Sequence, residues 1–241
     1  MHNTAPMLTS ENYFERGRIN QNKGNLDGAL ADYNQAIELN PKYASAFNGR
    51  GCIKEAKGDL NGAFADYNRA TELNPKYAMA FNNRSVVKKA KGDLDGALAD
   101  CNRAVELDPK LSLAFNNRGV IKQANGDLNG ALADYNCAIE LSPKYATAFN
   151  NRAAVKETKA DFDGALADYN DAIEINPKLA RAYKNRSRIK RIKGDVFGAY
   201  SDFNRALELE PKLFGPLMSS RLAKILMRWL LKRATAFRRK A

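Results

Sequence analysis

Apolar and small residues follow a pattern that repeats every 34 residues along this chain. Six of the eight prolines mark the period, because they lie 34 residues apart, at Pro41, Pro75, Pro109, Pro143, Pro177 and Pro211. Setting proline at position 32 divides the chain into six units, namely 10–43, 44–77, 78–111, 112–145, 146–179 and 180–213. A fixed period of this length indicates a repeat architecture, in which each unit buries its apolar face against its neighbours.

Within each unit, apolar residues recur at helical spacing, as at Leu94, Leu98, Cys101 and Val105. We therefore expect helix A at about positions 2–14 of each unit and helix B at about positions 17–30. A Gly-Asp turn such as Gly58-Asp59 separates them, because glycine adopts the left-handed conformation that ends a helix and aspartate caps the next one. The proline at position 32 cannot continue helix B.

Several positions keep one residue type in all six units. Positions 20 and 27 are always alanine, position 8 is always small, and position 4 is always aromatic: Tyr13, Phe47, Phe81, Phe115, Phe149 and Tyr183. Position 24 holds Tyr33, Tyr67, Cys101, Tyr135, Tyr169 and Phe203. Small residues let two helices approach closely, and the large aromatic residues fill the remaining space.

This period and this set of positions resemble the tetratricopeptide repeat. The resemblance implies an all-α fold, a right-handed α-solenoid of six helix-turn-helix repeats in which helix A lines the concave side. Residues 1–9 form an N-terminal extension in this interpretation, and residues 214–241 form a basic amphipathic C-terminal helix that caps the array. In the family, the concave groove binds a protein or peptide.

Charged residues stand where the family usually has apolar or aromatic ones. Position 7 is arginine in every unit, position 11 is lysine in units two to six, and position 23 is aspartate throughout. Since arginine and lysine four residues apart repel unless each finds an acid, we expect a ladder of Arg–Asp pairs between helices A and B, with a structural role.

Two rows of asparagine lie on the face of helix A that is expected to line the groove. They occupy positions 5 and 6, and comprise Asn48, Asn82, Asn83, Asn116, Asn117, Asn150, Asn151 and Asn185. Each amide offers donors and an acceptor, so such a row could hold the backbone of an extended peptide. The alternative is that these residues are solvated or cap local backbone, repeated because the units were duplicated.

The predicted groove differs along its length. The chaperone-peptide carboxylate clamp of the family is absent, because no unit has asparagine at position 9. The middle has an apolar strip of Met79, Val86, Leu113 and Val120, whereas the last unit is basic, with Arg181, Lys184, Arg188 and Arg191. A partner with an apolar segment followed by acidic residues suits both features. A solvated basic end is the alternative.

Residues 212–241 hold nine lysine and arginine residues and no acid, and so supply most of the net charge of +12. Arg221, Lys224, Arg228 and Lys232 form a basic ridge, opposite an apolar face that includes Leu222, Leu226 and Trp229. Capping of unit six is one interpretation. Self-association and contact of residues 217–240 with an anionic membrane surface are others.

Composition narrows the function further. The single histidine, His2, lies in the N-terminal extension, and no phosphate loop or nucleophile–base pair is present. We therefore expect a non-enzymatic scaffold with no catalytic residues, cofactor or metal. The three cysteines lack metal-ligand spacing and, with no signal segment, suggest a cytoplasmic protein. We expect no nucleic-acid partner, because the predicted groove lacks exposed aromatic residues for stacking. We expect a monomer or a weak homo-oligomer.

Overall fold

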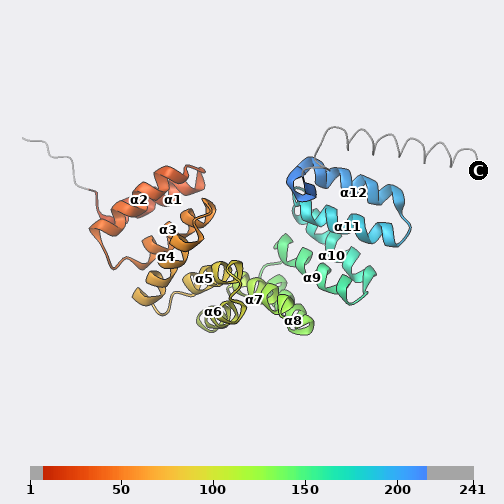
Figure 1. The fold of residues 1–241 in the computed structure, drawn as a ribbon, viewed down its shortest axis with the longest axis horizontal. Coiled ribbons are helices and arrows are strands. Elements are labelled where there is room, and N and C mark those ends of the chain that lie inside the picture. The colour runs from red at the N-terminus through yellow and green to blue at the C-terminus, as the bar shows by residue number, and fades with distance from the viewer. Residues whose placement is uncertain (1–7, 216–241) are drawn as a thin grey trace, which may run out of the picture. The chain divides into compact units, whose positions relative to one another are not determined.

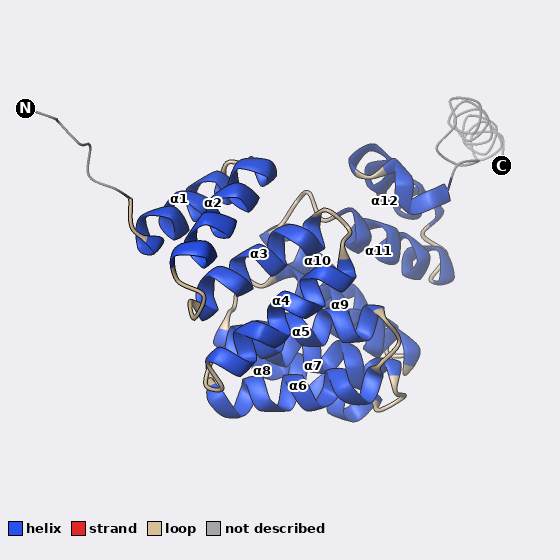
Figure 2. Cartoon of the chain, turned by 60° about the vertical axis from the view of Figure 1, so that its left-hand side comes forward, coloured by secondary structure: helices blue, strands red, loops and turns tan. Residues whose placement is uncertain are grey.

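The structure, a computed structural model, describes residues 8–215 as a series of antiparallel helix pairs without a strand in that range (Figures 1 and 2). Each unit supplies one pair. The helices are α1 Ser10–Asn22, α2 Leu26–Leu39, α3 Ala44–Ala56, α4 Leu60–Leu73, α5 Ala78–Ala90, α6 Leu94–Leu107, α7 Ser112–Ala124, α8 Leu128–Leu141, α9 Ala146–Thr158, α10 Phe162–Ile175, α11 Ala180–Ile192 and α12 Val196–Leu209. A 3-10 turn, η1, follows at Pro211–Phe214. The all-α solenoid of helix-turn-helix repeats is thereby confirmed.

The expected helix B, positions 17–30, agrees with the structure, whereas helix A covers positions 1–13 and not 2–14. The turn explains the difference. Gly58, at position 15, has φ +83°, and Asp59 at position 16 accepts a hydrogen bond from the Gly62 backbone N–H at 2.8 Å. A left-handed residue at position 15 requires helix A to end before it. In unit five the left-handed residue is Ala160, with φ 61°.

Inside each unit, a small residue on helix A faces a large one on helix B. A Cβ atom added to Gly51 would lie 2.6 Å from Cε1 of Tyr67, and one added to Gly119 would lie 2.7 Å from the same atom of Tyr135. Position 8 is therefore small because the aromatic ring at position 24 occupies the space. Both tyrosine rings are fully buried.

Each helix A also packs into the preceding unit. Ile53 joins a buried cluster with Ala29 and Tyr33 of unit one, and Val87 joins the equivalent cluster with Ala63 and Tyr67. Burial of these side chains supplies the hydrophobic stabilisation that a single hairpin lacks.

The chain divides into two compact parts, residues 1–141 and 142–241, which hold units one to four and units five and six. In the first part, α1, α3, α5 and α7 contact one another in succession, and they approach more closely than the helices B do. The helices A therefore lie on the inner side of this stack, as expected for the groove-lining helices. Residues 1–7 and 216–241, including the predicted C-terminal helix, lie outside the described residues.

Candidate functional site

The expected ladder of Arg–Asp pairs is present in all six units. Arg50 Nη2 lies 2.6 Å from Asp66 Oδ1, and Lys54 Nζ lies 2.8 Å from Asp66 Oδ2. The aspartate is buried and the two basic residues are partly exposed. One carboxylate thus separates the two cations that would otherwise repel each other. The equivalent arginine pairs are Arg16–Asp32, Arg84–Asp100, Arg118–Asp134, Arg152–Asp168 and Arg186–Asp202.

The same arginine connects its unit to the one before it. Arg50 Nη1 donates to Asn34 Oδ1 at 2.9 Å, and the guanidinium carbon lies 5.3 Å from the centre of the Phe47 ring. Arg84 makes the equivalent bond to Asn68 at 3.0 Å. The charge-assisted hydrogen bonds and the cation–π contacts of these arginines are all made within the array. The arginines at position 7 therefore have a structural role.

The asparagine rows form a chain of amide hydrogen bonds along the helices A of units two to four. Asn117 Nδ2 donates to Asn82 Oδ1 at 2.9 Å, Asn82 Nδ2 donates to Asn83 Oδ1 at 3.1 Å, and Asn83 Nδ2 donates to Asn48 Oδ1 at 3.0 Å. Asn116 Nδ2 donates to Asn117 Oδ1 at 3.3 Å. In the second part, Asn185 donates to Asn150 at 3.2 Å and Asn150 to Asn151 at 3.3 Å.

Burial distinguishes the two rows. The position-5 residues Asn48, Asn82, Asn116 and Asn150 are 3–8% exposed, whereas the position-6 residues Asn83, Asn117, Asn151 and Asn185 are half-buried. The position-5 amides therefore lie beneath the helix A surface and support the position-6 amides. In the position-6 row of units three and four, Asn83 Nδ2 also donates to Cys52 Sγ at 3.5 Å, whereas Asn117 Nδ2 keeps a second N–H for a partner. The role of the position-6 row in binding stays a prediction.

The apolar strip borders these amides. Val86, Val120 and Met79 are half-buried, and Leu113 is 40% exposed. Glu55 lies in the same region, but it accepts a hydrogen bond from the Tyr67 hydroxyl at 2.8 Å. Lys89, by contrast, is half-buried and has no side-chain partner among residues 8–215. The inner face of units two to four is thus a largely neutral surface with one available cation.

Sequence reasoning missed the link between positions 12 and 24. The tyrosine hydroxyl at position 24 donates to position 12, as from Tyr33 to Gln21 at 2.8 Å and from Tyr135 to Gln123 at 3.0 Å. Units three and six lack this tyrosine and have Lys89 and Arg191 at position 12. The signal was available, since glutamine or glutamate occupies position 12 wherever position 24 is tyrosine.

The structure places the four basic residues of unit six in different environments. Lys184 Nζ donates to the Leu213 carbonyl at 2.9 Å, and Arg188 Nη2 lies 2.5 Å from Glu157 Oε2. The bond to Glu157 raises the pKa of Arg188. Arg181 and Arg191 are exposed and have no partner among the described residues. Half of the predicted basic end is therefore already paired within the array.

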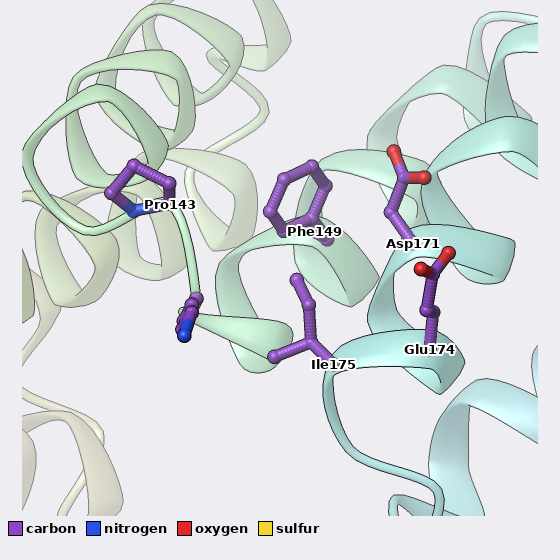
Figure 3. A pocket seen from close by; sticks show the side chains of 6 residues that line it. Pro143, Phe149, Asp171, Glu174 and Ile175 are labelled. Carbon is purple, nitrogen blue, oxygen red and sulfur yellow. The ribbon is translucent and has the colours of Figure 1, made fainter.

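A hollow of about 520 Å³ lies between the turn at Pro143 and helices α9 and α10 (Figure 3). Phe149 and Ile175 form its apolar wall, and Asp171 and Glu174 of α10 border it. In units two, three and six an arginine occupies the place of Asp171 and pairs with the glutamate, as Arg69 does with Glu72 at 3.1 Å.

Other kinds of site find no support in residues 8–215. No group of three His, Cys, Asp or Glu side chains is placed to hold a metal in this range. Cys52, Cys101 and Cys137 are free thiols, and burial raises the pKa of Cys101 to about 11. None of the described helices is long and apolar enough to cross a membrane. The expected cytoplasmic location stays a prediction.

Comparison with protein families gives several matches. Residues 17–58 and 121–159 match a model described as a TPR repeat. Residues 50–112 and residues 146–179 match two models described as tetratricopeptide repeats. Together these matches span more than half of the chain. The comparison with curated proteins gave no significant match.

Solved structures share this fold. A chain of the APC/C hetero-tetramer Cut9–Hcn1 matches 91% of this chain with a TM-score of 0.81 and 15% identity, and this chain spans 42% of that chain. PilF of Pseudomonas aeruginosa matches 86% of this chain and 93% of its own, with a TM-score of 0.73 and 18% identity. YrrB, described as a TPR protein with an unusual peptide-binding site, matches 72% of this chain and 89% of its own, with a TM-score of 0.54 and 26% identity.

Proposed function

Because this chain belongs to the tetratricopeptide repeat family, we propose that it is a scaffold that binds an extended segment of a partner protein. The fold generally mediates protein–protein interaction. Our proposal places the partner on the inner face of units two to four. We call this surface the inner groove and define it by Met79, Asn83, Val86, Leu113, Asn117 and Val120.

One observation carries the proposal, namely that the inner groove combines accessible apolar side chains with a row of oriented amides. The apolar residues can take up alternate side chains of an extended partner. Asn117 Nδ2 can donate its second N–H to the partner's backbone, and Asn83 Oδ1, which accepts from Asn82, has a second lone pair for a backbone N–H. The amides are held in place by the buried Asn48 and Asn82. Such preorganisation reduces the entropy lost on binding.

Charge indicates the composition of the partner. Glu55 is bonded to Tyr67, so Lys89 is the accessible cation on the inner face of units two to four. We therefore infer that the segment bound there is mainly apolar and carries an acidic residue opposite Lys89. The peptide-binding site described for YrrB supports this class of function by similarity. No catalytic step is part of the proposal.

The test compares partner capture by wild type and a Val86→Glu/Val120→Glu variant. The matched control is Ala65→Glu/Ala99→Glu, because both alanines are exposed on helices B. We expect the control to retain the wild-type partner and the groove variant to lose it. Circular dichroism must show equal helicity in all three proteins. Equal capture by the groove variant would contradict the proposal.

A further inference from the structure

The hollow beside α9 and α10 joins an apolar wall to two carboxylates of unit five. Asp171 and Glu174 are exposed, three residues apart on α10, and neither is paired with another side chain of residues 8–215. Figure 3 shows both carboxylates on the α10 side of the hollow, next to Phe149 and Ile175. The one basic residue that lines the hollow is Lys144.

The other units show which group binds a glutamate at this place. In units two, three and six, the arginine at position 26 donates to the glutamate at position 29 at 3.1, 3.2 and 3.4 Å, in the pairs Arg69–Glu72, Arg103–Glu106 and Arg205–Glu208. Asp171 stands at position 26 of unit five, so Glu174 lacks the guanidinium that three equivalent glutamates bind. An arginine from outside the unit can take that place.

The aspartate also reverses the local charge. In units two, three and six, the lysine at position 33 of the preceding unit, the arginine and the glutamate together carry a net charge of +1. In unit four, where position 26 is Cys137, the sum is zero. Around the hollow, Lys144, Asp171 and Glu174 sum to −1. Among units two to six, only unit five therefore has a negative net charge at this place.

We propose that residues 237–240 of the same chain bind in this hollow. Their sequence is Phe-Arg-Arg-Lys, and residues 216–241 hold eight basic residues and no acid. Because a single exposed ion pair contributes little, a ligand here needs more than one cation and an apolar contact. Arg238 and Arg239 can meet the two carboxylates, and the ring of Phe237 can pack on the apolar wall.

The point where the chain leaves the described residues supports the same occupant. Pro143 of the hollow and Pro211 of η1 both stand at position 32, so both lie at the end of the hairpins where helix B finishes. Helices α10, α11 and α12 and then η1 pack in succession. At 8–10 Å per packed helix, α10 lies about 20 Å from α12.

The intervening chain is long enough for this contact. Residues 216–232 span about 25 Å even as a helix, which exceeds the distance back to α10. The contact differs from capping of unit six, because it lies on unit five and uses residues after Lys232, the last member of the basic ridge.

A photoreactive benzoylphenylalanine in place of Phe237 tests the contact in the full-length chain. The purified protein is illuminated, and the joined peptides are identified by mass spectrometry. We expect cross-links within one molecule from position 237 to residues 143–149 or 171–175, which line the hollow.

Two substitutions of equal charge change show whether the carboxylates hold the segment. Asp171→Arg should abolish the cross-link, because the new guanidinium pairs with Glu174, and the array already carries arginine at this position in three units. The matched control is Glu140→Arg, which alters an exposed glutamate of unit four and should keep the cross-link. Circular dichroism must show equal helicity in all three proteins.

Four outcomes would overturn the proposal. The first is an unchanged cross-link in Asp171→Arg. Cross-linking between two molecules, seen as a dimer on a denaturing gel, would assign the hollow to a second copy of the chain. Cross-linking of position 237 to unit six alone would assign the segment to the end of the array. No cross-link to residues 143–149 or 171–175 would leave the hollow to a basic segment of another protein.

Discussion

At the residue scale, the buried aspartate at position 23 balances the charge of the arginine and the lysine on helix A of its unit. Asp100 accepts from Arg84 at 2.6 Å and from Lys88 at 2.9 Å while it is 4% exposed as a residue. Removing one member of a buried charge network leaves the others unpaired, which costs more than the network itself contributes.

We therefore predict that Asp100→Asn lowers the free energy of unfolding by about 3 kcal/mol. The control is Glu106→Gln, which breaks the exposed pair with Arg103 and should cost less than about 1 kcal/mol. Urea unfolding followed by circular dichroism measures both. Equal effects of the two substitutions would show that the ladder does not stabilise the fold.

In unit three, the residues at positions 8 and 24 both differ from those of units two and four, and they fit each other. Cys101 replaces tyrosine at position 24, and its thiol donates to Ser85 Oγ at 3.0 Å. We predict that Cys101→Tyr alone is destabilising by about 1–3 kcal/mol, because the ring meets Ser85. Adding Ser85→Gly recreates the pairing of Gly51 with Tyr67 and should restore stability. Additive losses in thermal unfolding would contradict this coupling.

Buried phenols predict an alkaline limit to stability. Burial raises the pKa of Tyr33 to about 12, above the value of about 10 for an exposed tyrosine. Its contribution is therefore fully present below about pH 10 and is lost as the pH rises toward 12. Urea titrations from pH 9 to 12 should show a smaller loss for Tyr33→Phe than for wild type. An identical loss in the two proteins would mean that ionisation of Tyr33 does not contribute to the fall in stability at high pH.

At the element scale, the turn between helices A and B sets where each helix stops. Unit five alone among the left-handed turn positions uses a non-glycine residue, Ala160 with φ 61°. A left-handed conformation costs an L-residue about 1–2 kcal/mol relative to glycine. The turn of unit five is therefore strained compared with the turn at Gly58.

We predict that Ala160→Gly stabilises the protein by about 0.5–1 kcal/mol. The substitution relieves the left-handed strain, but the greater entropy of glycine in the unfolded chain offsets part of that gain. The reverse change, Gly58→Ala, should destabilise it by a comparable amount. Differential scanning calorimetry gives both shifts. A lower melting temperature for Ala160→Gly would argue against strain at this turn.

Sequence alone predicted the position of helix B, because aspartate at position 16 caps its start and proline at position 32 lies just beyond its end. It also predicted the Arg–Asp ladder, since a cation at position 7 needs a buried acid. It did not predict the amide chain from Asn117 to Asn48, because hydrogen bonding between units depends on how neighbouring helices A approach. The bond of Lys184 to η1 and the ion pair of Arg188 with Glu157 of α9 were not predicted for the same reason.

At the scale of the whole molecule, stability is distributed over neighbouring units. Each helix A buries its apolar residues against the preceding hairpin, as Ile53 does against Tyr33. Residues 1–141 form one compact part, with four units. Arrays of this kind depend on nearest-neighbour contacts and not on distant ones.

We accordingly predict that a fragment of residues 1–141 folds on its own. Its circular dichroism spectrum should be helical, and its thermal unfolding should be cooperative but at a lower temperature than that of the whole chain. A fragment of the same residues with Asp66→Asn should be less stable still. An unfolded wild-type fragment would show that units five and six are required.

We propose that a partner binds along the inner groove. The most direct measurement places a photoreactive benzoylphenylalanine at Leu113, which is 40% exposed on helix A of unit four. The comparison site is Ala99, exposed on helix B of unit three. Illumination in cell lysate should join a partner to the chain labelled at position 113 and not to the chain labelled at position 99. Cross-linking at position 99 alone would place the partner on the outer face and contradict the account.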